Sequence, residues 1–257
     1  MSRLFEELDY QETPIGPISL RRRKQLSLGV DIFEIILGEE HLMSSLFTAS
    51  EIALAKLSLG DLPEAEAGSL DVVVGGLGLG YTAGAVLEDA RVGELLVIEL
   101  LQPVIYWHEQ GLVPLDPPLS ADGRCTTRQG DFFALAASES GFDTEQYGRL
   151  FDAILIDIDH TPDWLLDNRS GAFYSEEGLE QLATHLKPGG VMGLWSDAHT
   201  DEVFVARLGS VFESARAEPV TFHNPLQDKP FTQTVYLARK GVGFQSPDAV
   251  DPKINIT

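Results

Sequence analysis

The sequence predicts an α/β protein, with a doubly wound, mostly parallel sheet that carries helices on both faces and follows a small β-hairpin unit. From residue 71 onward, strand-like and helix-like segments alternate, as in consecutive β–α–β crossovers. The apolar run "LFDAILIDID" (150–159) is typical of a parallel strand buried on both faces. The first sixty residues hold short runs of alternating apolar and polar residues instead, and such runs favour antiparallel hairpins.

The predicted β unit spans residues 18–45, with turns at "PIGP" (14–17) and "LGEE" (37–40). Residues 46–59 carry apolar side chains at helical spacing, and the polar stretch 60–69 is typical of a connector. These changes of texture divide the chain into an N-terminal unit with its connecting helix, 1–60, and a main domain, 61–257.

The main domain is predicted to contain five crossover strands, five helices and a closing β pair. The strands are expected at 71–74, 94–100, 124–131, 150–159 and 191–197, and the last two β segments at 217–224 and 233–240. The helices are expected at 81–88, 102–111, 132–138, 175–187 and 201–212, with "PGG" (188–190) stopping the fourth.

Composition narrows the classes of partner. A formal net charge of −22 argues against nucleic acid and against anionic membrane surfaces, because both attract basic proteins. The same charge favours a small cationic substrate by electrostatic steering, although acidity that serves only solubility explains it equally well. No apolar run reaches 18 residues, and residues 1–13 lack the apolar core of a signal peptide. With its single cysteine, Cys125, the chain is expected to be cytoplasmic.

Acidic residues end four successive predicted strands. They are Glu99, Asp131, the pair Asp157 and Asp159, and Asp197. Each alone is ordinarily a helix cap or a solvated loop residue, but the carboxyl ends of parallel strands meet at one edge of a sheet, where ligands bind. We therefore expect these acids to surround one site. Their spacing, together with His160, does not fit a metal centre, and no metal is expected.

The glycine-rich turn "GGLGLG" (75–80) predicts a nucleoside ligand at this edge. Gly76, Gly78 and Gly80 form G-x-G-x-G rather than the G-x-G-x-x-G of dinucleotide-binding proteins, and the Lys-Ser/Thr of a P-loop is missing. A turn of this kind, followed by an acid after the next strand, seats an adenosyl group against the main chain. Glu99 would accept from the ribose hydroxyls, and Asp131, after Gly130, from the adenine amino group.

These motifs resemble the S-adenosylmethionine-dependent transferase fold, and within it the spermidine synthase branch. The similar segments are "GGLGLG", "VIEL", "GDFFAL" and "FDAILIDID" followed by "FY", together with "ETPIGPISL" near the start. The resemblance implies a small N-terminal β unit, a seven-stranded Rossmann-like sheet and a homodimer. It also implies aminopropyl transfer from decarboxylated S-adenosylmethionine, a co-substrate, to an amine, with release of methylthioadenosine and no metal.

Carried over from that family, the base that deprotonates the amine is Asp157, and Glu51 in "FTASE" belongs to the substrate region. Asp159 and His160 share the catalytic loop with Asp157; His160 is either a proton shuttle or a cap. Further acids and aromatic faces for a cationic amine are available at Asp159, Asp163, Asp167, Asp197, Trp164 and Trp195.

The sequence also departs from the family. Leu79 stands where the polyamine synthases carry an acid that holds the donor's amine, and "DIDHT" (157–161) replaces Asp-x-x-Asp-Pro. Ala49-Ser50 replaces an aromatic-His pair before Glu51, and the tyrosine-proline-glycine segment near the end is not recognisable. Two alternatives stay open: a methyltransferase that uses intact S-adenosylmethionine, and a non-catalytic relative that binds the nucleoside.

Overall fold

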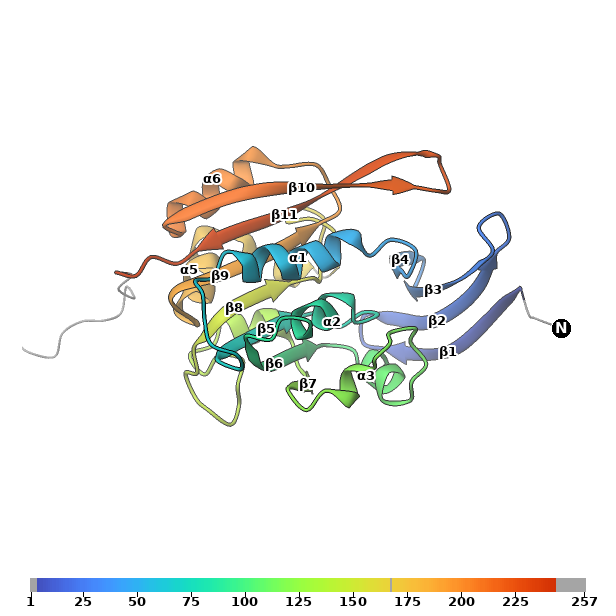
Figure 1. Cartoon of the computed structure of the whole chain (residues 1–257), viewed down its shortest axis with the longest axis horizontal. Coiled ribbons are helices and arrows are strands. Elements are labelled where there is room, and N and C mark those ends of the chain that lie inside the picture. Colours follow the sequence, from blue (N-terminus) through green and yellow to red (C-terminus); the bar gives the residue numbers. More distant parts are fainter. Residues whose placement is uncertain (1–3, 167, 244–257) are drawn as a thin grey trace, which may run out of the picture.

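The described part of the protein contains two β-sheets with helices packed against the larger one. The computed structural model describes residues 4–166 and 168–243; in this part of the chain a four-stranded sheet precedes a seven-stranded one (Figure 1). The predicted fold class, a mostly parallel doubly wound sheet behind a small N-terminal β unit, is confirmed. None of the helices in these ranges is both long and apolar enough to cross a bilayer.

The N-terminal sheet is an antiparallel meander. Its strands are β1 (Phe5–Thr13), β2 (Gly16–Gln25), β3 (Val30–Leu37) and β4 (Glu40–Ser44), paired in sequence order. The β1–β2 and β3–β4 turns fall in the predicted "PIGP" and "LGEE" segments, where Gly16 and Gly38 adopt positive φ angles of 126° and 60°.

The seven-stranded sheet has the strand order β10-β11-β9-β8-β5-β6-β7. Its parallel part consists of β5 (Leu70–Gly75), β6 (Val92–Glu99), β7 (Cys125–Gln129), β8 (Phe151–Ile156) and β9 (Leu186–Ser196). The closing hairpin of β10 (Ser214–Asn224) and β11 (Lys229–Arg239) adds antiparallel to β9. The carboxyl ends of β5, β6, β7, β8 and β9 therefore share one edge.

Helices cover both faces of this sheet because its central strands are apolar on both sides. Val72 and Val74 of β5 pack into the core shared with α1 (Ala49–Gly60), α2 (Tyr81–Leu87) and α3 (Gln102–Glu109). Val73 points into the opposite core, shared with α4 (Phe132–Ala136), α5 (Glu176–Thr184) and α6 (Glu202–Val211). Two short 3-10 helices lie at Leu119–Ala121 and Asn168–Tyr174.

Helix α1 fastens the N-terminal unit to the large sheet. A Cβ on Gly193 in β9 would lie 2.1 Å from Ser58 Oγ and 3.0 Å from Leu54 Cδ1, so α1 sits directly on the strand. Figure 1 shows α1 crossing this face of the sheet. The division of the chain into 1–60 and 61–257 stays a prediction.

The strand predicted at 191–197 begins earlier, at Leu186, and the preceding helix ends at Thr184. Leu186 pairs with Phe151 of β8, and a register irregularity between Phe151 and Ala153 takes up the "PGG" run. "PGG" thus lies inside a strand rather than terminating a helix. Pairing with a distant strand overrides the local breaker signal.

Candidate active site

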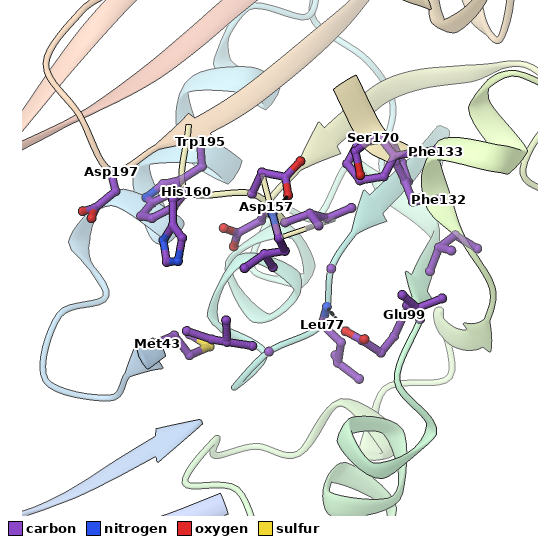
Figure 2. A pocket seen from close by; sticks show the side chains of 18 of the residues that line it. Met43, Leu77, Glu99, Phe132, Phe133, Asp157, His160, Ser170, Trp195 and Asp197 are labelled. Carbon is purple, nitrogen blue, oxygen red and sulfur yellow. Dashed lines mark hydrogen bonds between the residues drawn. The ribbon is translucent and has the colours of Figure 1, made fainter. Parts of the chain in front are cut away.

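A cavity of about 810 Å³ opens at the carboxyl ends of the parallel strands, where the two sheets meet. Its lining includes eleven of the predicted site residues, namely Glu51, Gly76, Gly78, Glu99, Gly130, Asp131, Asp157, Asp159, His160, Trp195 and Asp197. Figure 2 shows Asp157 between two groups of side chains. Glu99, Phe132 and Phe133 mark what we call the loop end, and His160, Trp195 and Asp197 mark the hairpin end.

The glycine turn between β5 and α2 is possible only with glycine. Gly76, Gly78 and Gly80 have φ angles of +89°, +49° and +90°. A Cβ on Gly76 would lie 2.1 Å from the backbone oxygen of Asp157, so this glycine lets the turn touch the end of β8. Gly80 is the N-cap of α2 and is not part of the cavity lining.

His108 holds the glycine turn from outside. Its Nε2 lies 2.9 Å from the Gly78 carbonyl oxygen, and a Cβ on Gly80 would lie only 2.7 Å from its Cε1. Burial lowers the pKa of His108, which favours the neutral imidazole donating from Nε2. Nothing in the sequence distinguishes this histidine from a core residue, because the contact joins α3 to a turn about thirty residues earlier.

Glu99 closes β6 beside the same turn. Its Oε2 accepts from the Leu77 amide at 2.9 Å and its Oε1 from the Leu101 amide at 2.8 Å (Figure 2). Burial raises the pKa of Glu99, while these backbone hydrogen bonds oppose the rise. The backbone amides of Gly78 and Leu100 add to this effect, so four main-chain groups surround the carboxylate. Glu99 therefore lies directly against the glycine turn.

Asp131 lies at the same edge, after β7, and begins α4. Its Oδ1 accepts from the Phe133 and Ala134 amides at 3.0 and 3.1 Å, the hydrogen bonds of an N-cap. Gly130 donates to the backbone oxygen of Glu99 at 2.9 Å, which holds the two acidic strand ends together. The cap function and a place in the cavity lining thus coexist in Asp131.

Glu51 and Asp157 form a buried pair of carboxyl groups in the middle of the cavity. Burial raises the pKa of Glu51 to about 7, and repulsion from Asp157 adds to the rise. Burial likewise raises the pKa of Asp157 to about 6, against a hydrogen bond from Thr82 that lowers it. Thr82 Oγ1 donates to Asp157 Oδ2 at 2.6 Å. Near neutral pH the pair therefore shares protons and can accept one from a ligand.

A chain of hydrogen bonds links this pair to the hairpin end. Ser50 Oγ lies 2.7 Å from Glu51 Oε2 and 2.6 Å from Gln233 Oε1, and it accepts from Trp195 Nε1 at 2.9 Å. Gln233 Nε2 in turn donates to Asp197 Oδ1 at 2.7 Å. The single hydroxyl proton of Ser50 serves either Glu51 or Gln233, so protonation of Glu51 and the orientation of this network are coupled.

Sequence reasoning missed Thr82, Ser50 and Gln233. Thr82 stands in the first turn of α2, and only the three-dimensional arrangement brings it to Asp157, 75 positions later. Ser50 and Gln233 are 183 positions apart. Hydroxyl and amide side chains are common on helices and strands, and one sequence carries no signal for such distant pairs.

Asp159 and His160 occupy the loop after β8. Asp159 is 3 % exposed, and its carboxylate accepts from the Leu166 amide and the Tyr174 hydroxyl, both at 2.8 Å. These contacts anchor the loop. His160 Nε2 is buried without a hydrogen-bond partner among the described residues and lies 3.4 Å from Glu40 Oε1 of β4.

The other aromatic and acidic candidates of this loop contribute less to the cavity. Trp164 is 59 % exposed and packs on the His160 ring with centroids 5.0 Å apart. Neither Trp164 nor Asp163 is part of the lining, and Asp167 lies outside the described residues. No cluster of three or more potential metal ligands occurs within residues 4–166 and 168–243.

Leu79 does not reach the cavity. Its side chain is fully buried in the core, and the space beside the turn is taken by Met43 of β4. Met43 Sδ lies 2.9 Å from the Leu79 amide nitrogen, and it is the atom a Cβ on Gly78 would meet first. The group beside the turn is thus a thioether supplied from the N-terminal sheet.

The raised pKa values of Glu51 and Asp157 predict that the stability of the protein depends on pH. Because both carboxyls bind protons more tightly in the folded state, their contribution to stability is full below about pH 4 and is lost as the pH rises through 6 to 7. We expect Glu51→Gln to unfold at a higher temperature than the wild type at pH 8, because the variant lacks the buried charge. The increase should be about 2–4 °C for each kcal/mol of electrostatic destabilisation removed. The gap should shrink at pH 5.

Thermal unfolding at pH 5 and pH 8 tests this expectation. Glu66→Gln, at an acid in the polar connector before β5, controls for the loss of one charge and should give the same small shift at both values. Equal melting temperatures for wild type and Glu51→Gln at pH 8 would show that Glu51 carries no electrostatic cost.

Solved structures provide the comparison with known proteins. No protein-family model and no curated protein matches the sequence. By structure, the chain is similar to a spermidine synthase in complex with the transition state analogue AdoDATO, with a TM-score of 0.69, 18 % identity, and coverage of 92 % of this chain and 74 % of that one.

Two further spermidine synthases are similar. The enzyme from Thermotoga maritima gives a TM-score of 0.67 at 17 % identity, covering 92 % of this chain and 73 % of that one. A probable spermidine synthase from Corynebacterium glutamicum gives 0.61 at 17 % identity, with coverage of 94 % and 83 %. The chain therefore has the spermidine synthase-like form of the class I S-adenosylmethionine-dependent transferase fold, and the resemblance noted in the sequence is confirmed at the level of fold.

Proposed function

We propose that the protein is a transferase that moves an aminopropyl group from decarboxylated S-adenosylmethionine to a small cationic amine. The observation that carries this proposal is the buried pair Glu51 and Asp157, placed beside the glycine turn and able to take up a proton near neutral pH. An amine nucleophile reaches such a site as an ammonium and must lose a proton to react. The similarity to spermidine synthase folds supports the same reaction.

The donor nucleoside is proposed to lie at the loop end. Its ribose hydroxyls would donate to the Glu99 carboxylate, and its adenine amino group would donate to Asp131 Oδ2. Gly76 and Gly78 would let the sulfur-bearing side of the nucleoside approach the main chain. The structure bound to AdoDATO shows that this fold accommodates a transition state analogue in a relative.

The reaction needs few parts from the protein. The lone pair of the acceptor nitrogen attacks the aminopropyl carbon, the carbon–sulfur bond breaks, and its electron pair stays on sulfur as the thioether of methylthioadenosine. The proton lost by the acceptor passes to Asp157, and Thr82 holds that carboxylate in place. Asp197 and Trp195 would bind the single ammonium group of the acceptor, and His160 would relay a proton toward Glu40. A homodimer and a cytoplasmic location stay predictions.

Binding of two nucleosides separates this proposal from its alternatives. We expect calorimetry to show methylthioadenosine binding at least tenfold more tightly than S-adenosylhomocysteine, because the second compound adds a carboxylate to a site already rich in acids. The reverse preference would favour methyl transfer, for which the lack of an acid at Leu79 is the supporting observation. If neither compound binds, both aminopropyl transfer and methyl transfer are overturned. Binding without turnover of any amine would favour a non-catalytic relative.

A further inference from the structure

We propose that the acceptor is an amine with one cationic end and an apolar, ring-sized body, rather than a linear diamine charged at both ends. The inference rests on the proposed aminopropyl transfer and adds the chemical class of the acceptor. It comes from the composition of the hairpin end of the cavity, where the acceptor must lie if the donor occupies the loop end.

The N-terminal sheet lines this end mostly with apolar side chains. The described residues of β2–β4 and the β1–β2 turn that reach the cavity are Ile15, Ile35, Leu37, His41, Leu42, Met43 and Ser44. None of these seven is acidic. Burial of an ammonium against such a wall without a partner is unfavourable, whereas burial of an apolar group there is favourable.

Three phenylalanines extend the apolar wall. Phe47, between β4 and α1, has its ring centroid 5.8 Å from that of Phe222, which lies 5.8 Å from Phe231. Phe222 and Phe231 are register partners across β10 and β11, where this hairpin reaches beyond the rest of the sheet toward β4 (Figure 1). All three line the cavity, and Phe231 is still 37 % exposed. Ring faces at these spacings fit an apolar or aromatic body.

Two acids of the N-terminal sheet near this wall, Glu34 and Glu40, already have cationic or imidazole neighbours. Glu34 of β3 pairs with Arg23 at 2.9 Å and lies 3.5 Å from His41, and Glu40 lies 3.4 Å from His160. A second ammonium at the far end of an acceptor would therefore meet imidazoles and apolar groups. Because that second ammonium would find no free carboxylate among the described residues of the wall, its burial there selects against a diamine.

The two amino groups that take part in the reaction already use the carboxylates in the middle and at the hairpin end of the cavity. Because Leu79 supplies no acid, the donor's own ammonium must use a carboxylate among Glu51, Asp157 and Asp197. The attacking nitrogen of the acceptor needs another. Glu51 and Asp157 share protons near neutral pH, so little unmatched negative charge is left for a third ammonium.

The test compares acceptors of similar length. With decarboxylated S-adenosylmethionine present, release of methylthioadenosine is measured with hexylamine, 4-phenylbutylamine, 1,6-diaminohexane and 1,4-diaminobutane. We expect kcat/KM for the two monoamines to exceed that for either diamine by at least about tenfold. If a diamine is used as well as or better than the monoamines, the inference is overturned and the proposed aminopropyl transfer stands. If no amine releases methylthioadenosine, the proposed function fails, and the inference fails with it.

Two variants of the wall give independent readouts. Phe222→Ala should raise KM for 4-phenylbutylamine about tenfold and leave kcat and methylthioadenosine affinity unchanged. Phe5 is an exposed phenylalanine of β1 outside the cavity, and Phe5→Ala should leave all three quantities unchanged. Leu42→Asp places a carboxylate on the apolar wall and should shift the preference toward 1,6-diaminohexane. A folded Phe222→Ala that keeps the wild-type KM, or a folded Leu42→Asp that keeps the monoamine preference, would contradict the inference.

Discussion

Asp157→Asn is expected to lower the rate of aminopropyl transfer by about 10²–10⁴-fold, the usual contribution of a general base. Asparagine keeps the size of the side chain and can still accept from Thr82, but it cannot take up the proton of the acceptor. The glycine turn and Glu99 are unaffected by the change, so affinity for methylthioadenosine should stay within about tenfold.

Single-turnover rates and calorimetry on the same preparation separate these two effects. Asp228→Asn is a matched control, because it removes one charge at the tip of the β10–β11 hairpin, outside the cavity, at a positive φ of 51° that asparagine tolerates. A wild-type rate in Asp157→Asn would remove Asp157 from the mechanism. Loss of rate together with loss of nucleoside binding would indicate a structural role instead.

Gly76→Ala is expected to abolish nucleoside binding and to destabilise the protein by about 2–4 kcal/mol. The positive φ of 89° strains any other residue, and the added Cβ would lie 2.1 Å from the backbone oxygen of Asp157. The position of a Cβ is set by its own backbone and its partner is a backbone oxygen, so neither can turn aside. The turn and the end of β8 must move apart, and this separates Glu99 from the acid pair.

Gly84→Ala is the matched control for this change. Gly84 lies in α2, and its Cβ would meet Leu115 Cδ1 at 3.4 Å, an ordinary contact, while alanine favours the helix by up to about 1 kcal/mol. Denaturant unfolding and calorimetry should therefore show opposite signs for the two variants. A Gly76→Ala protein with wild-type stability and affinity would contradict the described turn.

The sequence predicted the sheets and the strand ends because their signals are local. Buried parallel strands are apolar in every residue, and a glycine turn followed by acids at strand ends places Glu99, Asp131 and Asp157 at one edge. The start of β9 was not predicted, since pairing of Leu186 with Phe151 decides it. The hydrogen bonds of Asp159 to Leu166 and Tyr174 were likewise beyond reach.

The pairing of Glu51 with Asp157 could not be predicted from the sequence either. Glu51 was assigned to the substrate region by resemblance alone, and only the structure shows that it lies close enough to Asp157 to raise its own pKa. The pairing depends on α1 crossing the large sheet, which local patterns do not encode. What surrounds the site in space, rather than which residues end the strands, is therefore the part that required coordinates.

A crystal structure with methylthioadenosine tests the central claim most directly. The account predicts both ribose hydroxyls within about 2.7–3.2 Å of the Glu99 carboxylate, the adenine amino group at Asp131, and the sulfur directed toward Asp157. A nucleoside bound elsewhere, or bound in this cavity with its ribose away from Glu99, would contradict it.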